Sequence, residues 1–195
     1  MNQGAAIANF GNAHLYRLTL TENTGYGAYA NSAYFDDTQI GCISYLTNCT
    51  VTNNYDDEAN GIDLYDDNGG STLTLINSIV AGNKGGGVDL VQYNGSAFLN
   101  GNNIIGTSDS LLFNEITDML GLDPLLDELT NVSGTVYYHP LKVNSPAINA
   151  IANDSDNAEN AAGKNGDPKK NRHLRYWGSR IGSRYLQHYC LIHLG

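Results

Sequence analysis

Apolar residues recur along the first half of the chain in one spacing, at positions n, n+3 and n+5. A strand places alternate residues on one face, so a step of three between two inward positions means that the chain bends there. Successive copies begin 31, 29 and 24 residues apart, a period typical of solenoids and arrays. The inward positions are Leu15/Leu18/Leu20, Leu46/Cys49/Val51, Leu75/Ser78/Val80 and, in a fainter copy, Leu99/Asn102/Ile104.

An Asn follows each template, and a Gly then opens a second alternating run. The Asn positions are Asn23, Asn54 and Asn83, with Thr107 in the faint copy, and the second runs lie at 27–30, 61–64 and 87–90. Asn tolerates the left-handed backbone conformation, and its amide can bond to the coils above and below. The recurrent Asn therefore predicts a stacked ladder at a corner. The alternative is that Asn and Gly only mark loops.

Short strands separated by corners, each stacked on its counterpart about 4.8 Å away, predict an all-β parallel β-helix, a solenoid of about four to six coils. A propeller would need longer, four-stranded blades, and a sandwich would not require similar strands. We expect coils over 1–107, an irregular closing segment over 108–150 and an atypical basic tail over 151–195. Because "GAAIAN" near the start matches a second run, we also expect the first coil to be open and available for end-to-end self-association.

The charge of the chain, −10 in total, is distributed unevenly. Residues 1–141 contain 16 acidic side chains and only Arg17 and Lys84 as bases, whereas 168–195 contain six bases and no acid. The acidic body argues against nucleic acid as a partner, and the absence of a long apolar run argues against a membrane span. Of the three cysteines, Cys49 occupies an inward template position, and a Cys42–Cys49 bridge stays open; the third is Cys190.

The repeats "LTLINSIVAGN" and "GGGVDL", followed by "GLDPLLDEL" and "HPLKVNSPAINA", resemble secreted bacterial proteins with polymorphic-outer-membrane-protein-like β-helix repeats, of the choice-of-anchor Q type, over about residues 4–150. The resemblance implies a right-handed parallel β-helix, a secreted or cell-surface location and no established enzymatic activity. The chain departs from the family at Asn149, where the family has Asp, and in its basic ending. We therefore expect residues after about 165 to pack unlike the family's.

Acidic pairs in the predicted loops are weak calcium candidates, because Ca²⁺ prefers six to eight oxygen ligands. No EF-hand spacing is present, and the alternative is a solvated acidic surface that keeps a strand-rich protein from aggregating. No other cofactor is expected. The candidates are Asp56, Asp57, Asp66 and Asp67.

Asp63 and Asp89 are weak catalytic candidates, because they are predicted to face outward one coil apart, and glycoside hydrolases use two carboxylates about 5–9.5 Å apart. Repeats also align like residues for structural reasons alone. Outward Thr pairs at 19–21 and 50–52 suggest an ice-binding ladder, which Ile79 and Ala81 interrupt. We expect a structural hydrogen bond from His139, and Tyr side chains beside the acidic loops can contact sugars.

The function predicted from the sequence is a non-catalytic, secreted or surface-displayed structural or adhesive module that self-associates end to end and has carbohydrate as a candidate ligand. The alternative is a polysaccharide hydrolase that uses loop carboxylates.

Overall fold

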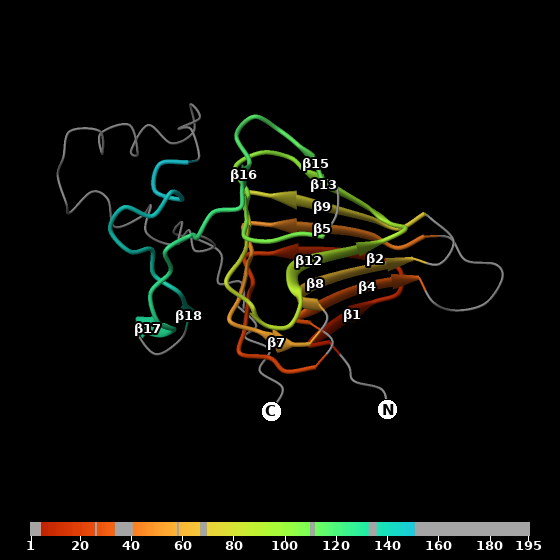
Figure 1. Cartoon of the computed structure of the whole chain (residues 1–195), viewed down its shortest axis with the longest axis horizontal. Helices are drawn as coiled ribbons and strands as arrows, with labels where there is room; N and C mark the ends of the chain where they lie inside the picture. The colour runs from red at the N-terminus through yellow and green to blue at the C-terminus, as the bar shows by residue number, and fades with distance from the viewer. Residues whose placement is uncertain are drawn as a thin grey trace, which may run out of the picture.

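The computed structural model describes residues 5–25, 27–33, 41–57, 59–66, 70–109, 112–132 and 136–150, and every regular element in these ranges is a β-strand. The main body has three sheets of parallel strands, and within each sheet the strands of successive coils are stacked along one axis (Figure 1). We call them sheets A, B and C. Sheet A has the order β1 (Ile7–Asn9), β4 (Tyr29–Ala33), β8 (Ala59–Asp66), β12 (Val88–Tyr93).

Sheets B and C have five strands each. The order in sheet B is β2 (Asn12–Tyr16), β5 (Ile43–Thr47), β9 (Thr72–Ile76), β13 (Ser96–Leu99), β15 (Phe113–Asn114). The order in sheet C is β3 (Thr19–Thr21), β6 (Thr50–Thr52), β10 (Ile79–Val80), β14 (Ile104–Ile105), β16 (Met119–Leu120). Two short pairs complete the list: parallel β7 (Tyr55–Asp56) with β11 (Lys84–Gly85), and antiparallel β17 (Thr130–Val132) with β18 (Val136–Tyr138).

The register confirms the predicted solenoid of stacked, similar strands. Leu15, Leu46, Leu75 and Leu99 occupy one column across sheet B. Between sheets B and C the chain turns through a left-handed residue at Arg17, Asn48 and Asn77, with φ of 57°, 56° and 50°. This corner accounts for the step of three in the template, because it resets which face the next strand presents inward.

The predicted alignment of the faint fourth copy of the template differs by one residue from the register of the strands. Val80 pairs with Ile105, not with Ile104, and Ser78 N donates to Asn103 Oδ1 at 2.9 Å, which makes Asn103 rather than Asn102 the inward residue at the corner. The cause is one added residue, since two successive residues here, Gly101 and Asn102, have positive φ.

The interior of the stack is an aliphatic column. Leu46, Leu75 and Val80 are completely buried, and burying one such side chain contributes about 1.5–3 kcal/mol. A polar cluster replaces the aliphatic residues near β1 and β4, where the Tyr29 hydroxyl bonds to Ser44 Oγ at 2.5 Å and Ser44 Oγ donates to Asn31 Oδ1 at 2.8 Å. Buried polar groups of this kind are tolerated because they satisfy one another.

The predicted asparagine ladder is present. Asn23 Nδ2 donates to Asn54 Oδ1 at 2.9 Å, and Asn54 Nδ2 donates to Asn83 Oδ1 at 2.8 Å. The ladder residues themselves are not left-handed, contrary to expectation. The left-handed residue is the one before each of them, namely Glu22, Asn53 and Gly82, with φ of 60°, 56° and 73°. The ladder Asn contributes its amide, and its predecessor makes the turn.

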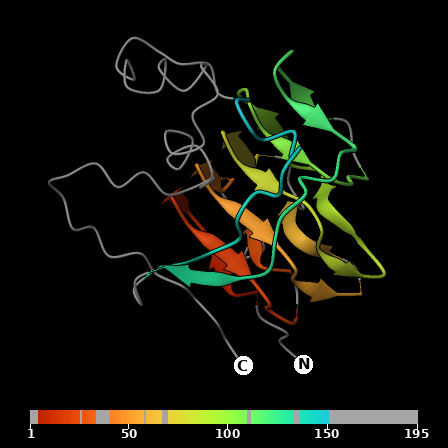
Figure 2. The same cartoon turned by 90° about the vertical axis from the view of Figure 1, so that its left-hand side faces the viewer.

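The coils continue further than predicted, because β15 and β16 extend sheets B and C to Leu120, beyond residue 107. The closing segment that follows, residues 122–150, crosses the outer face of sheet C (Figure 2). Its Leu141 and Ala147 pack on Ile79 and Ile104. The two pieces that resemble the family's closure hold each other, since Ser145 Oγ donates to the Pro124 carbonyl at 2.5 Å.

The closing segment buries the predicted threonine ladder. Thr19 and Thr50 pair in register, as do Thr21 and Thr52, but Thr21, Thr50 and Thr52 are at most 3% exposed. The ladder therefore offers no flat surface to ice or to any other ligand. The tail 151–195, with Cys190, and the acidic residue Asp67 lie outside the described residues.

Candidate functional site

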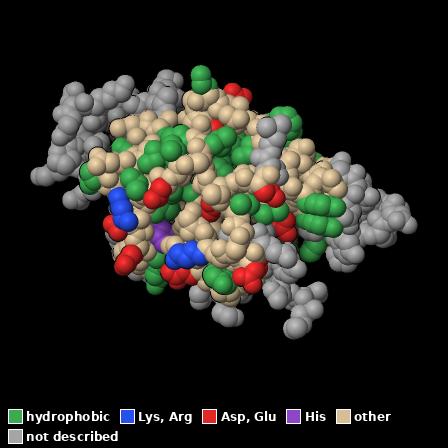
Figure 3. All heavy atoms as spheres, viewed as in Figure 1, with side chains coloured by type: hydrophobic (Ala, Val, Ile, Leu, Met, Phe, Trp, Pro, Cys, Tyr) green, Lys and Arg blue, Asp and Glu red, His purple; other side chains and the backbone are tan. Residues whose placement is uncertain are grey.

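The outer face of sheet B is a surface of five strands without a charged residue. Alternate residues of β2, β5, β9, β13 and β15 point outward, and within these strands there is no Asp, Glu, Lys or Arg. Elsewhere acidic side chains outnumber basic ones (Figure 3). The outward residues of the three central strands are Ile43, Tyr45, Thr47, Thr72, Thr74, Ile76, Ser96 and Phe98.

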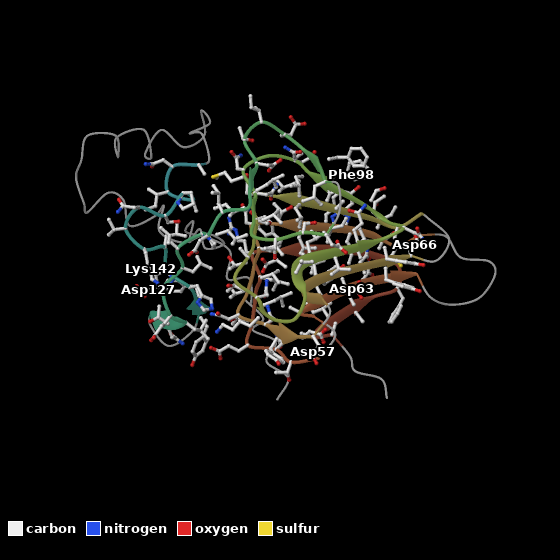
Figure 4. All side chains as sticks on the ribbon, viewed as in Figure 1. Asp57, Asp63, Asp66, Phe98, Asp127 and Lys142 are labelled. Carbon is white, nitrogen blue, oxygen red and sulfur yellow. The ribbon has the colours of Figure 1, made fainter. Side chains whose placement is uncertain are left out.

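One column of outward residues across this face contains four rings and one threonine, and we call it the aromatic column. Its members are successive partners in the register: His14, Tyr45, Thr74, Phe98 and Phe113. The rings of His14 and Tyr45 stack with centroids 4.5 Å apart, and those of Phe98 and Phe113 stack at 5.2 Å. Tyr45, Phe98 and Phe113 are 36%, 38% and 55% exposed, and Phe98 projects from the coil surface (Figure 4).

Thr74 separates the two stacks. Tyr45 and Phe98 lie on the strands to either side of it, which places them about 9.6 Å apart at a strand spacing of about 4.8 Å. Each of the two rings is covered on one side by its stacked neighbour and turns its other side toward Thr74. The face therefore carries two aromatic walls above a threonine floor.

Asp63 and Asp89, the predicted catalytic pair, are not neighbours in the register. Asp63 lies between Ala30 and Val91, whereas Asp89 lies at a register shift where β8 advances three residues and β12 advances two. Asp89 instead enters the corner ladder and is only 5% exposed. The predicted outward position of Asp89 is therefore wrong.

The Asp89 carboxylate is fully used by the backbone and side chains around it. Its Oδ1 accepts from Asn83 N and Asn83 Nδ2, both at 2.8 Å, and its Oδ2 accepts from Thr107 N at 2.9 Å and Thr107 Oγ1 at 2.8 Å. Four such bonds to one ionised group satisfy its acceptor capacity. This arrangement is that of a structural carboxylate at the end of a ladder.

The calcium candidates that the structure describes lie apart around one coil, with Asp57 next to β7 and Asp66 at the far end of β8 (Figure 4). Asp66 is buried and accepts from Gly70 N at 2.5 Å and from Ser71 N, so it closes the loop that leads to β9. Asp56 is 8% exposed on β7, and Asp57 beside it is exposed. Within the described residues no three His, Cys, Asp or Glu side chains come together as metal ligands.

His139 makes the structural hydrogen bonds expected of it. It is 4% exposed, its Nδ1 lies 2.8 Å from the Asp127 carbonyl, and its Nε2 lies 3.0 Å from Thr21 Oγ1. A carbonyl only accepts, so Nδ1 donates to it, and Nε2 forms a hydrogen bond with the threonine hydroxyl. The histidine thereby ties the closing segment to β3.

Cys42 and Cys49 are buried thiols that are not joined in a disulfide. Burial raises the pKa of the Cys42 thiol, and it raises the pKa of Cys49 to about 11. Because the thiolate is the reactive form, neither cysteine is a nucleophile near neutral pH. Cys49 fills the small inward position that the template predicts.

The aromatic column escaped the sequence-based prediction, although a signal for it exists. His14, Tyr45, Thr74 and Phe98 each occupy the position directly before a template leucine, and they become neighbours once the strands are stacked. The apolar spacing marks only the inward positions of each strand, and the aromatic column occupies outward positions.

A hollow of ≈ 410 Å³ opens at the end of the stack near β14 and β16. Apolar and polar side chains line it in equal number, and the apolar ones are Ile105, Leu112 and Leu120. The hollow thus reaches Ile105 and Leu112, two buried residues of the last coils.

Comparison of the chain with protein-family models, with curated proteins and with solved structures gave no match. Within the described part of the chain, no helix has the length and apolar character needed to cross a membrane.

Proposed function

We propose that the chain is a non-catalytic structural or adhesive module, secreted or displayed at the cell surface, built as a right-handed parallel β-helix of about four to six coils. The observation that carries this proposal is the outer face of sheet B, where rings are exposed on a rigid, uncharged surface. Exposed aromatic side chains on rigid elements are typical anchors of binding surfaces. The Asp89 carboxylate, by contrast, is occupied by the fold.

End-to-end self-association is a second part of the proposal. Strands β1, β2 and β3 are each last in their sheets at one end, and β12, β15 and β16 at the other. Strand edges with unpaired N–H and C=O groups favour pairing with another chain, and the hollow beside β16 can receive apolar side chains. A head-to-tail contact of this kind builds open filaments when its rotation does not close.

The decisive experiment for the adhesive function is a parallel assay of binding and hydrolysis. The full chain is incubated with neutral and acidic polysaccharides, bound protein is measured by co-sedimentation, and new reducing ends are measured in the same samples. We expect binding without new reducing ends. New reducing ends that disappear in Asp63→Asn would establish the competing hydrolase.

The filament is tested separately by electron microscopy and light scattering over a range of protein concentrations. Growth with concentration is the expected result. Uniform monomers at all concentrations would refute end-to-end association and leave the adhesive function standing.

A further inference from the structure

We infer that the aromatic column is the binding site for a neutral polysaccharide, and that one sugar ring inserts between Tyr45 and Phe98 above Thr74. This inference rests on the proposed adhesive function and names its ligand. The juxtaposition that supports it is two outward rings, on strands β5 and β13, with a small hydroxyl side chain between them on β9.

The width of the gap fits one ring. Carbon atoms in contact lie about 3.5–4.0 Å apart, so a single inserted ring needs about 7–8 Å between the walls, and two stacked rings need more than 10 Å. The walls are about 9.6 Å apart by strand spacing. A sugar ring is thicker than a planar ring because of its axial hydrogens, and it fills this gap more closely than a flat aromatic ligand would.

The charge of the face selects the class of ligand. Sheet B has no charged side chain in its described strands, although the whole chain carries −10. Acidic polysaccharides and nucleic acids are repelled by the charge of the body, and Arg17 lies at the edge of the sheet, over the Tyr16 ring of β2, rather than beside Thr74 on β9. A neutral polysaccharide is not repelled by the acidic body and does not need a cation. Its hydroxyls can exchange hydrogen bonds with Thr72 and Thr74, each of which offers one donor and acceptor lone pairs.

The direction of the bound chain follows from the stacking. His14 covers the far side of Tyr45, and Phe113 covers the far side of Phe98, so rings block a path across the strands. A path along β9 is lined by Thr72, Thr74 and Ile76, which are half-buried and smaller. The polysaccharide therefore lies parallel to β9.

The experiment is native affinity electrophoresis of the full chain in gels that contain glucomannan, xyloglucan or hydroxyethyl cellulose, with polygalacturonate and alginate as anionic arms. We expect retardation by at least one neutral polymer and none by the anionic ones. Tyr45→Ala and Phe98→Ala should each weaken binding about tenfold, the size expected when one aromatic contact is lost. Tyr137→Ala, which removes a tyrosine of similar exposure on β18, should leave binding unchanged.

Thr74→Phe separates insertion from simple adhesion to exposed rings. The added ring would complete the column and fill the gap, so insertion predicts loss of binding, while strand structure is preserved because aromatic residues favour strands. Binding that is stronger in Thr74→Phe, or unchanged in both alanine variants, would overturn the proposed site.

Two further outcomes have a defined meaning. Concentration-dependent dimers by light scattering that Phe98→Ala abolishes would identify a second copy of the chain as the occupant and overturn the polysaccharide proposal. New reducing ends in the same samples would refute the non-catalytic function, whereas loss of the site alone would leave that function intact.

Discussion

Replacing Asn54 tests whether the corner ladder holds the solenoid together. The side chain is completely buried and makes five hydrogen bonds. Its Oδ1 accepts from the backbone and the side chain of Asn23 at 3.1 and 2.9 Å. The two hydrogens of its Nδ2 are shared among the Leu20 and Thr52 carbonyls and Asn83 Oδ1, at 3.0, 3.0 and 2.8 Å.

The expected loss follows from these contacts. A typical buried hydrogen bond contributes about 0.5–1.5 kcal/mol net, and a buried group left without a partner costs about 1–3 kcal/mol. Asn54→Ala removes all of these contacts, while some of the partner groups keep a second hydrogen bond. We therefore expect the free energy of unfolding to fall by about 3–6 kcal/mol. The free energy of unfolding of a domain is about 5–15 kcal/mol, so this loss should lower the Tm by about 10 °C or more.

The assay is urea unfolding followed by far-ultraviolet circular dichroism. Asn12→Ala is the matched control, because Asn12 is exposed on β2 and its loss should change the stability by less than about 0.5 kcal/mol. Asn54→Asp keeps the shape but cannot donate to the three acceptors, and it should cost at least as much as Asn54→Ala. Equal unfolding midpoints for Asn54→Ala and Asn12→Ala would refute the ladder as a source of stability.

Three further predictions concern the core, the closure and pH. Leu75→Asp should abolish cooperative unfolding, because it places a charge in the buried column. Thr74→Asp, one residue away on the outer face, should still fold. Equal circular dichroism spectra for the two variants would contradict the inward assignment of Leu75. His139→Ala should lower the free energy of unfolding by about 1–3 kcal/mol and speed proteolysis within 122–150. His14→Ala is the control and should have neither effect. Burial raises the pKa of Cys49 to about 11 and of Tyr29 to about 12, so both groups bind protons more tightly when folded. The free energy of unfolding should therefore be unaffected by these groups below pH ~9. As the pH rises toward the two pKa values, it should fall by up to about 1.4 kcal/mol per pH unit for each group. Tyr29→Phe should reduce this fall, as measured by urea unfolding at a series of pH values.

The repeated inward spacing made the stacked strands predictable. Leu46, Leu75 and Leu99 had to share a column because a shift of one residue would turn each of them outward. The Asn ladder followed from the same periodicity. The additional residue at the Gly101–Asn102 corner could not be read, because a single added residue leaves the apolar pattern nearly unchanged.

The candidate site was harder to predict, because it depends on contacts between coils. Phe98 and Phe113 are 15 positions apart and meet only through the register of β13 and β15. Asp89 alternates correctly in the sequence, and only the fold brings Asn83 and Thr107 to its carboxylate. The burial of Thr50 and Thr52 requires the closing segment to return over sheet C, which no local pattern in the coils encodes.

The corner ladder also gives the solenoid a chemical polarity. From Asn23 to Asn54 and from Asn54 to Asn83, the backbone N–H and the side-chain amide of one asparagine donate toward the following coil. Asn83 donates to the Asp89 carboxylate, which also accepts from Thr107 and so ends the series of side-chain donors. At the opposite terminus, Asn23 Oδ1 is buried and finds no donor among the described residues. An amide donor can thus bond to Asn23 Oδ1 by the same chemistry, whereas both oxygens of Asp89 already accept from Asn83 and Thr107, so the two ends of the ladder are not interchangeable.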